Sequence, residues 1–395
     1  MSYRVLVSLI LILTFIRCQA RPEFSPTPTL PSAPEPTVTL FPWIPERGGQ
    51  TFLKSRMGKC LFRSPLPVIY PTTSGELRQL AEANGVWVGT SVGANPLRGT
   101  NEYSTAVARD FNLIVPEVGL KFEIVHPEPD RYDFCQMDTI LAFAEVNGMR
   151  VRGHPLVWEQ QLPLWVWDLS LSQEQWKALL HDHVSRLVGR YQGEIEEWDV
   201  VNELFTEEGT LKATIWYQNI GPEYIELALR WAHDTDPNAR LFINEFATEN
   251  LNSKSDALYA LAQDLLGRGV PLHGIGFQMH LTESNPPDPA QVAENFRRFG
   301  ELGLEVQITE LDIRILKPVK PENLAHQAEI YQTLMEICLS APNCDTFVLW
   351  GVSDHNSWIK YVSEEWGSPL ILDDAYTPKP AYWALVETLQ LEERE

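Results

Sequence analysis

Short apolar runs alternate with longer amphipathic stretches from about residue 85 onward, and this alternation restricts the fold more than any other feature of the chain. Short apolar runs are typical of buried parallel strands, whereas stretches with a period of about 3.6 residues predict helices. The predicted strands are 86–90, 112–116, 149–153, 197–202, 240–244, 274–278, 305–309 and 346–350. The predicted helices include 136–147, 173–191, 223–234, 255–268, 290–300 and 323–340.

Strand units that alternate with helices in this way over about 300 residues predict an α/β fold, the (β/α)8 or TIM barrel. A doubly wound open sheet is the alternative, but no glycine-rich phosphate-binding loop follows the first predicted strand. In a (β/α)8 barrel the carboxyl ends of the strands form the face that carries the active site. The residues at the predicted strand ends therefore decide which chemistry is available.

Polar and aromatic side chains stand at most of these strand ends. They are Glu117, Lys121, Glu123, His154, Trp158, Asn202, Glu203, Asn244, Glu245, Gln278, His280, Glu310, Asp312, Trp350 and Trp358. Each has an ordinary explanation, because a carboxylate after a strand is more often a helix cap or surface ion pair, and a tryptophan is more often core. Their joint occurrence favours an active site. Two carboxylates on different strands, with tryptophans that can stack on sugar rings, suit cleavage of a glycosidic bond.

The chain resembles glycoside hydrolase family 10, the endo-β-1,4-xylanases, whose fold is a (β/α)8 barrel. The resemblance covers roughly residues 75–390 and rests on the segments RGHPLVW, WDVVNE, GIGFQMHL, ITELDI, WGVSDHNSW and TPKPAYWAL, which occur in the family's order. It implies a hydrolase that acts on xylan or xylo-oligosaccharides and requires no cofactor or metal.

The resemblance also implies roles for individual residues. Glu203 would be the general acid and base, and Glu310 the nucleophile of a retaining mechanism, for which the two carboxyl groups are expected about 5–5.5 Å apart. His280 and Asp312 would orient Glu310, and Asn202 would bind the 2-hydroxyl of the sugar. The implied substrate-binding residues are Glu117, Lys121, His154, Trp158, Gln161, Asn202, Gln278, Trp350 and Trp358.

Four positions depart from the family pattern. Val118 replaces an asparagine, Phe122 a tryptophan, Glu159 a histidine, and Phe246 a tyrosine. None of these changes removes the catalytic pair. We expect them to change the preferred length and decoration of the sugar chain.

The N-terminal segment and the charge indicate where the protein acts. Residues 1–20 resemble a secretory signal peptide, 21–46 form a Pro/Thr-rich linker, and 47–395 form the catalytic domain. Arg17 argues against a lipid anchor at Cys18. The net charge of −22 disfavours nucleic acid and anionic membranes as partners, and we expect a secreted monomer.

The cysteines and three rival interpretations complete the predictions. Cys338 and Cys344 flank a short turn and are candidates for a disulfide, whereas the pairing of Cys60 and Cys135 stays open. GTSVG (89–93) matches the nucleophile elbow of serine esterases, but no helix is predicted directly after it. His181-Asp182-His183 cannot chelate one metal on a helix and suggests a solvated face. A barrel that binds β-1,4-glycans with weakened chemistry, or one that cleaves β-1,4-glucan, also remains open.

Overall fold

The computed structural model describes residues 76–392, beginning with α2 (Glu76–Ala83) and ending with α14 (Pro380–Glu392). The predicted signal peptide, the predicted linker, Cys18 and Cys60 lie outside the described residues. Within 76–392, no helix is long and apolar enough to cross a bilayer.

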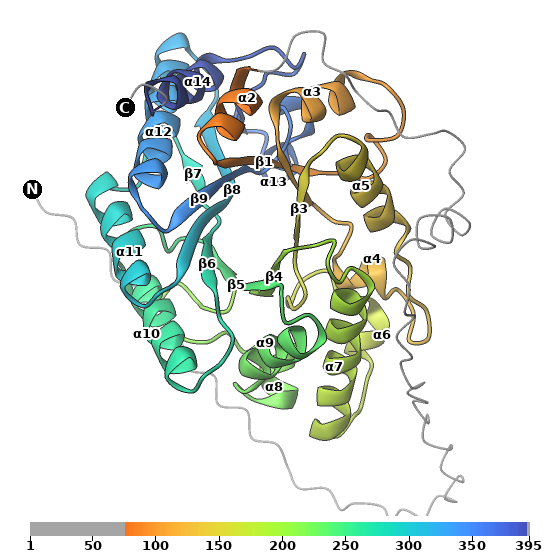
Figure 1. Ribbon diagram of the computed structural model, residues 1–395. Coiled ribbons are helices and arrows are strands. Elements are labelled where there is room, and N and C mark those ends of the chain that lie inside the picture. Colours follow the sequence, from red (N-terminus) through yellow and green to blue (C-terminus); the bar gives the residue numbers. More distant parts are fainter. Residues whose placement is uncertain (1–75, 393–395) are drawn as a thin grey trace, which may run out of the picture. The chain divides into compact units, whose positions relative to one another are not determined.

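Eight parallel strands close into a barrel in the described part of the chain (Figure 1). They are β1 (Trp87–Val92), β2 (Leu113–Pro116), β3 (Arg150–Gly153), β4 (Glu197–Asn202), β5 (Arg240–Glu245), β6 (Gly274–Phe277), β8 (Glu305–Leu316) and β9 (Cys344–Leu349). Each strand pairs with its neighbour along this series, and β9 pairs with both β8 and β1, which closes the sheet. The predicted (β/α)8 barrel is confirmed.

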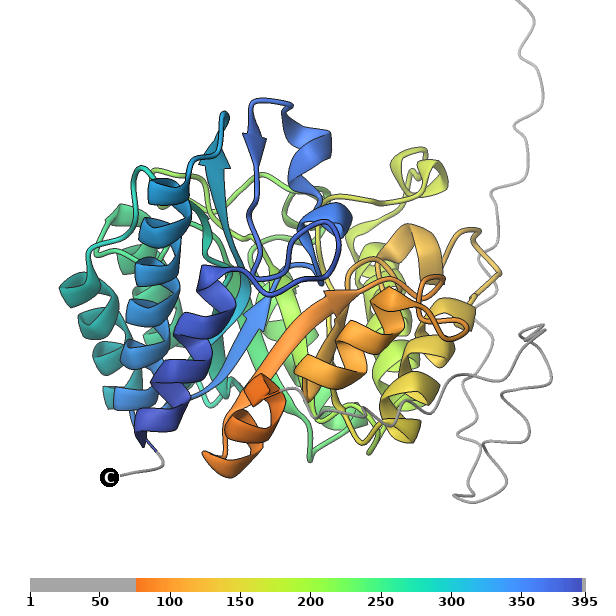
Figure 2. The same cartoon turned by 90° about the horizontal axis from the view of Figure 1, so that it is seen from above.

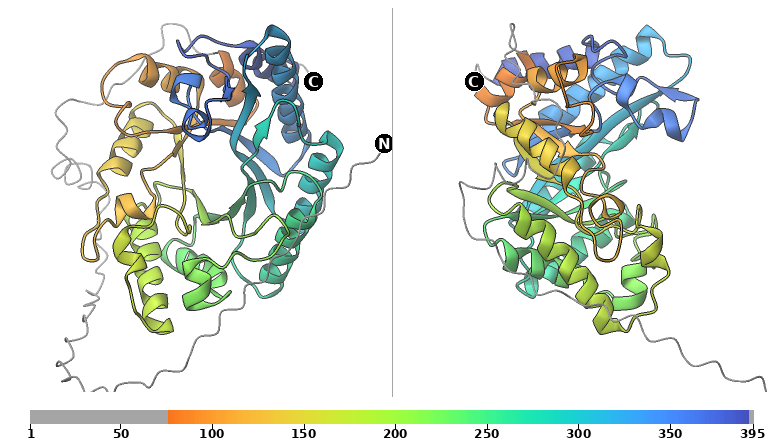
Figure 3. Two further views of the ribbon diagram at one scale, coloured as in Figure 1. Left: turned by 180° about the vertical axis from the view of Figure 1, so that it is seen from behind. Right: turned by 90° about the vertical axis from the view of Figure 1, so that its right-hand side faces the viewer.

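Longer helices surround the barrel on its outer side (Figures 1 and 3). Besides α2 and α14 they are α3 (Glu102–Asp110), α5 (Cys135–Val146), α7 (Gln173–Arg190), α9 (Tyr224–Thr235), α10 (Ser253–Gly267), α11 (Pro289–Glu301) and α12 (Pro321–Ser340). Each of the six predicted helices is found within two residues of its expected ends. The chain contains capping residues where these helices begin: Ser172 accepts a hydrogen bond from Gln175 N before α7, and Asp288 accepts one from Ala290 N before α11.

Short elements occupy the loops between the barrel strands and the outer helices. They are α4 (Phe122–Val125), α6 (Leu164–Trp167), α8 (Ile215–Ile220), α13 (Ile359–Val362), the 3₁₀ helix η1 (Asp354–Asn356), β7 (His280–Thr282) and β10 (Trp366–Gly367).

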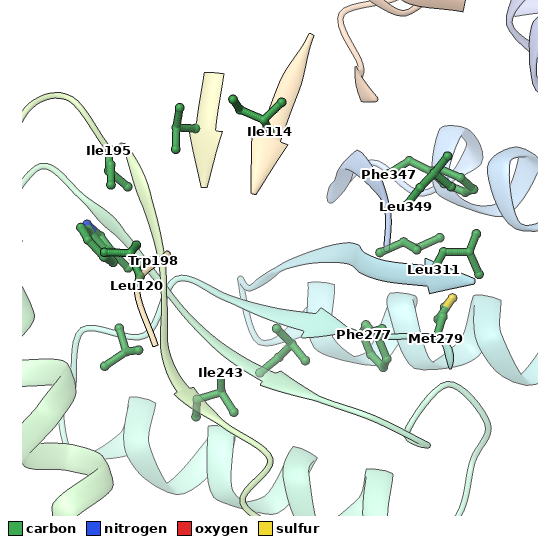
Figure 4. Close-up of a cluster of buried hydrophobic side chains, with 14 of the residues drawn as sticks. Ile114, Leu120, Ile195, Trp198, Ile243, Phe277, Met279, Leu311, Phe347 and Leu349 are labelled. Carbon is green, nitrogen blue, oxygen red and sulfur yellow. The ribbon is translucent and has the colours of Figure 1, made fainter. Parts of the chain in front are cut away.

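Alternate residues of each strand belong to different layers. Ile114, Phe347 and Leu349 pack in the large core between the strands and the helices, part of which appears in Figure 4. Leu113, Val115 and Val348, whose side chains point to the other face of their strands, form a separate apolar cluster with Trp350 inside the barrel. The period-two alternation therefore distributes apolar side chains to both faces of the sheet.

The other half of the barrel interior is charged. Arg152 on β3 is fully buried and pairs with Asp199 and Glu197 on β4; its Nη1 lies 3.2 Å from a Glu197 oxygen. Gln307 on β8 accepts a further hydrogen bond from Arg152. Burial alone would make the guanidinium easier to deprotonate, but Asp199 and Glu197 outweigh it and raise the pKa of Arg152. The paired charges hold β3, β4 and β8 together beneath the strand ends.

β8 is much longer than the predicted strand 305–309, because it continues to Leu316. Its outer part pairs with β7 on one side and with β10 on the other. In Figure 2 the end of β8 and the short β10 stand side by side above the barrel. The polar residues that interrupt the apolar run, Glu310, Asp312 and Arg314, hid this extension from a pattern-based prediction.

A disulfide joins Cys338 at the end of α12 to Cys344 at the start of β9, with their Cα atoms 5.1 Å apart, as the sequence suggested. Ser91 of the GTSVG segment is buried within β1 instead of standing on an elbow, so the esterase interpretation has no structural support. The prediction of a solvated face for the His181–His183 segment is wrong for His183. This residue is fully buried because its ring stacks on Phe122 with centroids 4.0 Å apart.

Candidate active site

A cleft of about 520 Å³ opens at the carboxyl ends of the strands. Among the residues lining it are all those predicted to contact substrate or to act in catalysis: Glu117, Lys121, His154, Trp158, Gln161, Asn202, Glu203, Gln278, His280, Glu310, Trp350 and Trp358. Asp312 is fully buried directly behind His280. Val118, Gln160, Phe246 and Arg314 complete the lining. Residues from seven different strand ends thus meet in one place because the barrel closes.

Glu310 lies on β8 and is almost completely buried, with 4% of its surface exposed. Its Oε1 accepts a hydrogen bond of 2.6 Å from Asn244 Nδ2 and lies 3.8 Å from His154 Nε2. Its Oε2 lies 3.2 Å from His280 Nε2. Burial favours the neutral acid, but His154 and His280 together outweigh burial and lower the pKa of Glu310 below its ordinary value. Glu310 is therefore an ionised carboxylate at neutral pH.

His280 is held as a cation between two carboxylates. Its Nδ1 donates to Asp312 Oδ2 at 2.9 Å, and its Nε2 donates to Glu310. Burial alone would lower the pKa of His280, but the charge and hydrogen bond of Asp312, with help from Glu310, raise it to about 10. The indole N–H of Trp358 donates to the same Asp312 oxygen at 2.7 Å, which fixes this carboxylate in turn. Asp312 thus orients His280, and His280 orients Glu310.

Glu203 follows β4 in a backbone conformation that side chains rarely adopt, with φ at +59°. Its backbone N–H donates to Asn244 O at 3.0 Å, which holds this turn in place. Gln278 Nε2 lies 3.4 Å from Oε1, and Gln160 Nε2 and Lys212 Nζ lie 3.5 and 3.6 Å from Oε2. Backbone strain of this kind is typical of functional sites, and here it accompanies a carboxylate that borders the cleft.

Three amide side chains connect the two glutamates. Asn202 Oδ1 accepts hydrogen bonds from Asn244 Nδ2 at 2.9 Å and from Gln278 Nε2 at 3.1 Å. Both donors occupy the oxygen of Asn202, so its Nδ2 is left for the cleft. Asn244 also receives the hydroxyl of Thr309 at its Oδ1, which fixes the orientation of its amide. The sequence placed Asn244 at a strand end but assigned it no role. Its role in positioning Glu310 and Asn202 depends on contacts with residues of β4 and β8, which the sequence alone does not show.

The remaining predicted binding residues form one wall of the cleft. Lys121 Nζ lies 4.9 Å from the centre of the Trp158 ring, and burial lowers the pKa of Lys121 although Glu310 and Glu117 oppose this effect. Burial raises the pKa of Glu117, which Lys121 partly offsets. Trp350 packs edge-on against His154, with ring centroids 5.2 Å apart. This wall combines aromatic rings with charged hydrogen-bonding groups, as sugar-binding sites do.

Two of the four departures from the family pattern, Val118 and Phe246, line the cleft. Glu159 pairs with Lys212 at 3.2 Å, so the cation that approaches Glu203 is itself held by a carboxylate. Phe246 lines the cleft without a hydroxyl, and Lys254 Nζ lies 3.2 Å from its ring centre. Phe122 stacks on His126 and His183 and does not line the cleft. Within the described range, no cluster of three or more His, Cys, Asp or Glu side chains could hold a metal ion.

Glu245, the carboxylate next to Asn244, is not part of the cleft. It is fully buried and pairs with Lys254 at 2.9 Å, and its Oε2 accepts the backbone N–H of Phe205. Its position after a strand is therefore explained by its structural contacts.

Comparisons with known proteins give a consistent result. The family model described as glycosyl hydrolase family 10 matches residues 76–388. Endo-1,4-beta-xylanase B of Thermotoga neapolitana is 39% identical over 317 residues, covering 80% of this chain and 91% of that protein. Native xylanase 10B of Thermotoga maritima superposes with a TM-score of 0.79 at 38% identity, covering 82% of this chain and 100% of the other. Xylanase 10B of Thermotoga petrophila RKU-1, solved in complex with xylobiose, gives the same TM-score at 37% identity, covering 82% and 99%.

The family match spans most of the chain, and the fold and the cleft residues agree with it. The chain belongs to glycosyl hydrolase family 10.

Proposed function

We propose that this protein is a secreted endo-β-1,4-xylanase that cleaves internal bonds of xylan with retention of configuration. The observation that carries the proposal is a deeply buried Glu310 that is connected to Glu203 through the side chains of Asn244, Asn202 and Gln278 within one cleft. The names of the relatives support the choice of xylan, since several are endo-1,4-beta-xylanases and one was solved with xylobiose.

In the first step of the proposed mechanism, a carboxylate oxygen of Glu310 attacks the anomeric carbon of the bound sugar. The bond from that carbon to the glycosidic oxygen breaks while Glu203 donates its proton to the leaving oxygen. The product is a sugar ester of Glu310. In the second step, Glu203 accepts a proton from water, the water oxygen attacks the anomeric carbon, and the ester bond breaks to release Glu310 as a carboxylate.

The surrounding groups favour this sequence of steps. His154, His280 and Asn244 keep Glu310 ionised and oriented before the substrate arrives. The Nδ2 of Asn202 can donate to the sugar 2-hydroxyl, and hydrogen bonds to this hydroxyl strengthen as positive charge develops on the ring.

Release of reducing sugar from linear xylan tests the proposed activity, with linear β-1,4-glucan as the comparison substrate. We expect Glu310→Gln and Glu203→Gln each to lower the turnover of xylan by at least about 10³-fold. On an aryl xyloside with an activated leaving group, Glu203→Gln should still form the glycosyl-enzyme, because that leaving group needs no proton. Glu283→Gln is the matched control, since Glu283 pairs with His326 and does not line the cleft.

The stereochemical course and the site of attachment distinguish this mechanism from its alternatives. Proton NMR of the first product should show the β-anomer before mutarotation. Mass spectrometry after trapping with a 2-fluoro-xyloside should find the sugar on Glu310. An initial α-anomer would exclude retention, and a wild-type protein that hydrolyses no β-1,4-glycan would support a barrel that only binds.

The proposal of secretion rests on the segment 1–20 and is tested separately. N-terminal sequencing of protein recovered from culture medium should begin after Ala20. Retention of the full-length chain inside the cell would contradict it.

A further inference from the structure

Arg314 is a cation of the cleft wall whose side chain has no ion pair or hydrogen bond within residues 76–392. Its Nε is buried without a hydrogen-bond partner among these residues, and its guanidinium lies over the ring of Trp366, whose centre is 5.3 Å from Cζ. Lys121, another cation lining the cleft, is influenced by four glutamates, and His280 lies between Asp312 and Glu310. An unpaired, partly desolvated guanidinium is costly in a folded protein unless a ligand pairs with it.

The carboxylates nearest to Arg314 along the paired strands are engaged elsewhere. Asp312 accepts from His280 and Trp358, and Glu310 accepts from His280 and Asn244. Glu283, which follows the residue paired with Arg314 on β7, lies 2.7 Å from His326 Nδ1 and accepts from Asn323. Intramolecular pairing therefore does not account for the charge of Arg314.

The position of Arg314 indicates which part of a substrate could reach it. Glu310, Asp312 and Arg314 are two residues apart on β8, so their side chains point to the same face of the strand. Arg314 follows Glu310 by about 13 Å of extended chain, which exceeds the size of one sugar ring. It lies beyond Asp312, whose Oδ2 also accepts the indole N–H of Trp358, a residue that lines the cleft.

We propose that Arg314 and Trp366 form a subsite that binds the carboxylate of a hexuronic acid branch on a xylan chain. This inference rests on the proposed function and names its substrate class. A planar guanidinium donates two parallel hydrogen bonds to a carboxylate, and the adjoining indole provides a surface on which the branch sugar packs. A protein with a net charge of −22 repels acidic substrates at long range, so productive binding of such a branch requires a local cation.

Hydrolysis of four matched oligosaccharides tests the proposal. The substrates are a linear xylo-oligosaccharide, the same chain with one hexuronic acid branch, that branch as its methyl ester, and a neutral pentose branch at the same position. We expect the wild type to show kcat/KM about tenfold higher for the acid than for its methyl ester. Its products should carry the acid a constant number of sugars from the point of cleavage.

Three variants locate the effect. Arg314→Gln should lower kcat/KM about tenfold on the acid branch and less than about twofold on the linear, esterified and neutral substrates. Arg314→Lys should retain part of the preference for the acid over its methyl ester, because lysine keeps the positive charge but lacks the two parallel N–H donors of the guanidinium. Arg297→Gln removes the same charge from the surface of α11, where Arg297 pairs with Glu294, and should leave the preference unchanged.

If Arg314→Gln lowered kcat/KM equally on all four substrates, or on none of them, the inference would be overturned. The comparison of acid with methyl ester uses only the wild type, so it decides the question even if Arg314→Gln does not fold. Cleavage of linear xylan without discrimination between acid and ester would refute this inference alone. Absence of cleavage on every substrate would refute the proposed function together with it.

Discussion

Asn244 contacts both sides of the candidate active site. Its backbone oxygen accepts the N–H of Glu203, and its side-chain amide donates to Glu310 and to Asn202. Because it is fully buried, these contacts do not compete with water. One side chain thus positions the proposed nucleophile and the residue next to the proposed acid.

Replacing Asn244 by alanine should therefore affect chemistry as well as stability. We expect kcat on linear xylan to fall by about 10–100-fold, because small displacements of reacting groups are costly, and the free energy of unfolding to fall by about 1–3 kcal/mol. Asn112→Ala is the control: Asn112 is buried and hydrogen-bonded to Val86 and Val88 at the opposite end of the barrel. It should cost similar stability in denaturant unfolding and leave kcat unchanged; a comparable fall in kcat would contradict the assigned role.

His280 makes the stability of the protein depend on pH. Its pKa is about 10 in the folded protein, above the ordinary value of 6.5, so folding favours its protonated form. The resulting stabilisation is complete below about pH 6.5 and is lost as the pH rises through about 10. Relative to His280→Gln, the wild type should therefore lose free energy of unfolding between about pH 6 and pH 10, as measured by denaturant titration. A constant difference between the two proteins would show that Asp312 and Glu310 do not hold the proton.

The strands show how far the sequence determined the elements. Periodicity located seven of the eight barrel strands to within two residues, because their apolar side chains are needed on both faces. It missed the outer half of β8, where Glu310, Asp312 and Arg314 face the cleft and break the apolar pattern. The strand ends predicted most members of the cleft, but the hydrogen bonds of Asn244 and the lack of an ion pair at Arg314 within residues 76–392 depend on contacts between strands far apart in sequence.

The packing of β3 against β4 offers a test at the level of elements. Gly153 leaves room for the indole of Trp198, since a Cβ built on Gly153 would lie 2.3 Å from the nearest ring atom. Gly153→Ala should push the ring outward and lower the free energy of unfolding by about 1–3 kcal/mol. Gly267→Ala in α10, where the added methyl meets nothing within 4 Å, should be neutral or slightly stabilising. Equal melting temperatures for the two variants would contradict this account.

The stability of the whole barrel depends on the charge cluster in its interior. Arg152→Met would remove the fully buried cation that Glu197 and Asp199 share, and we expect a loss of about 3–5 kcal/mol in the free energy of unfolding. Arg152 lowers the pKa of Asp199 against the effect of burial, so the loss should shrink as the medium becomes acidic and Asp199 protonates. Arg297→Met on the exposed side of α11 should change stability little at any pH. A loss that stays constant with pH would show that the cluster acts by packing alone.

The length of β8 has a consequence for which bond is cut. Glu310 and Arg314 lie on one continuous strand, so the distance between the proposed nucleophile and the proposed branch-binding residue is fixed. Along this strand every second residue faces the cleft. Inserting two residues between Asp312 and Arg314 would preserve the facing of both and move the anchored branch outward by about 7 Å. Inserting one residue would turn Arg314 to the opposite face of the strand, and the branch would no longer fix the position of cleavage. The spacing of residues along β8 would then set the distance between the acidic branch and the bond that is cleaved.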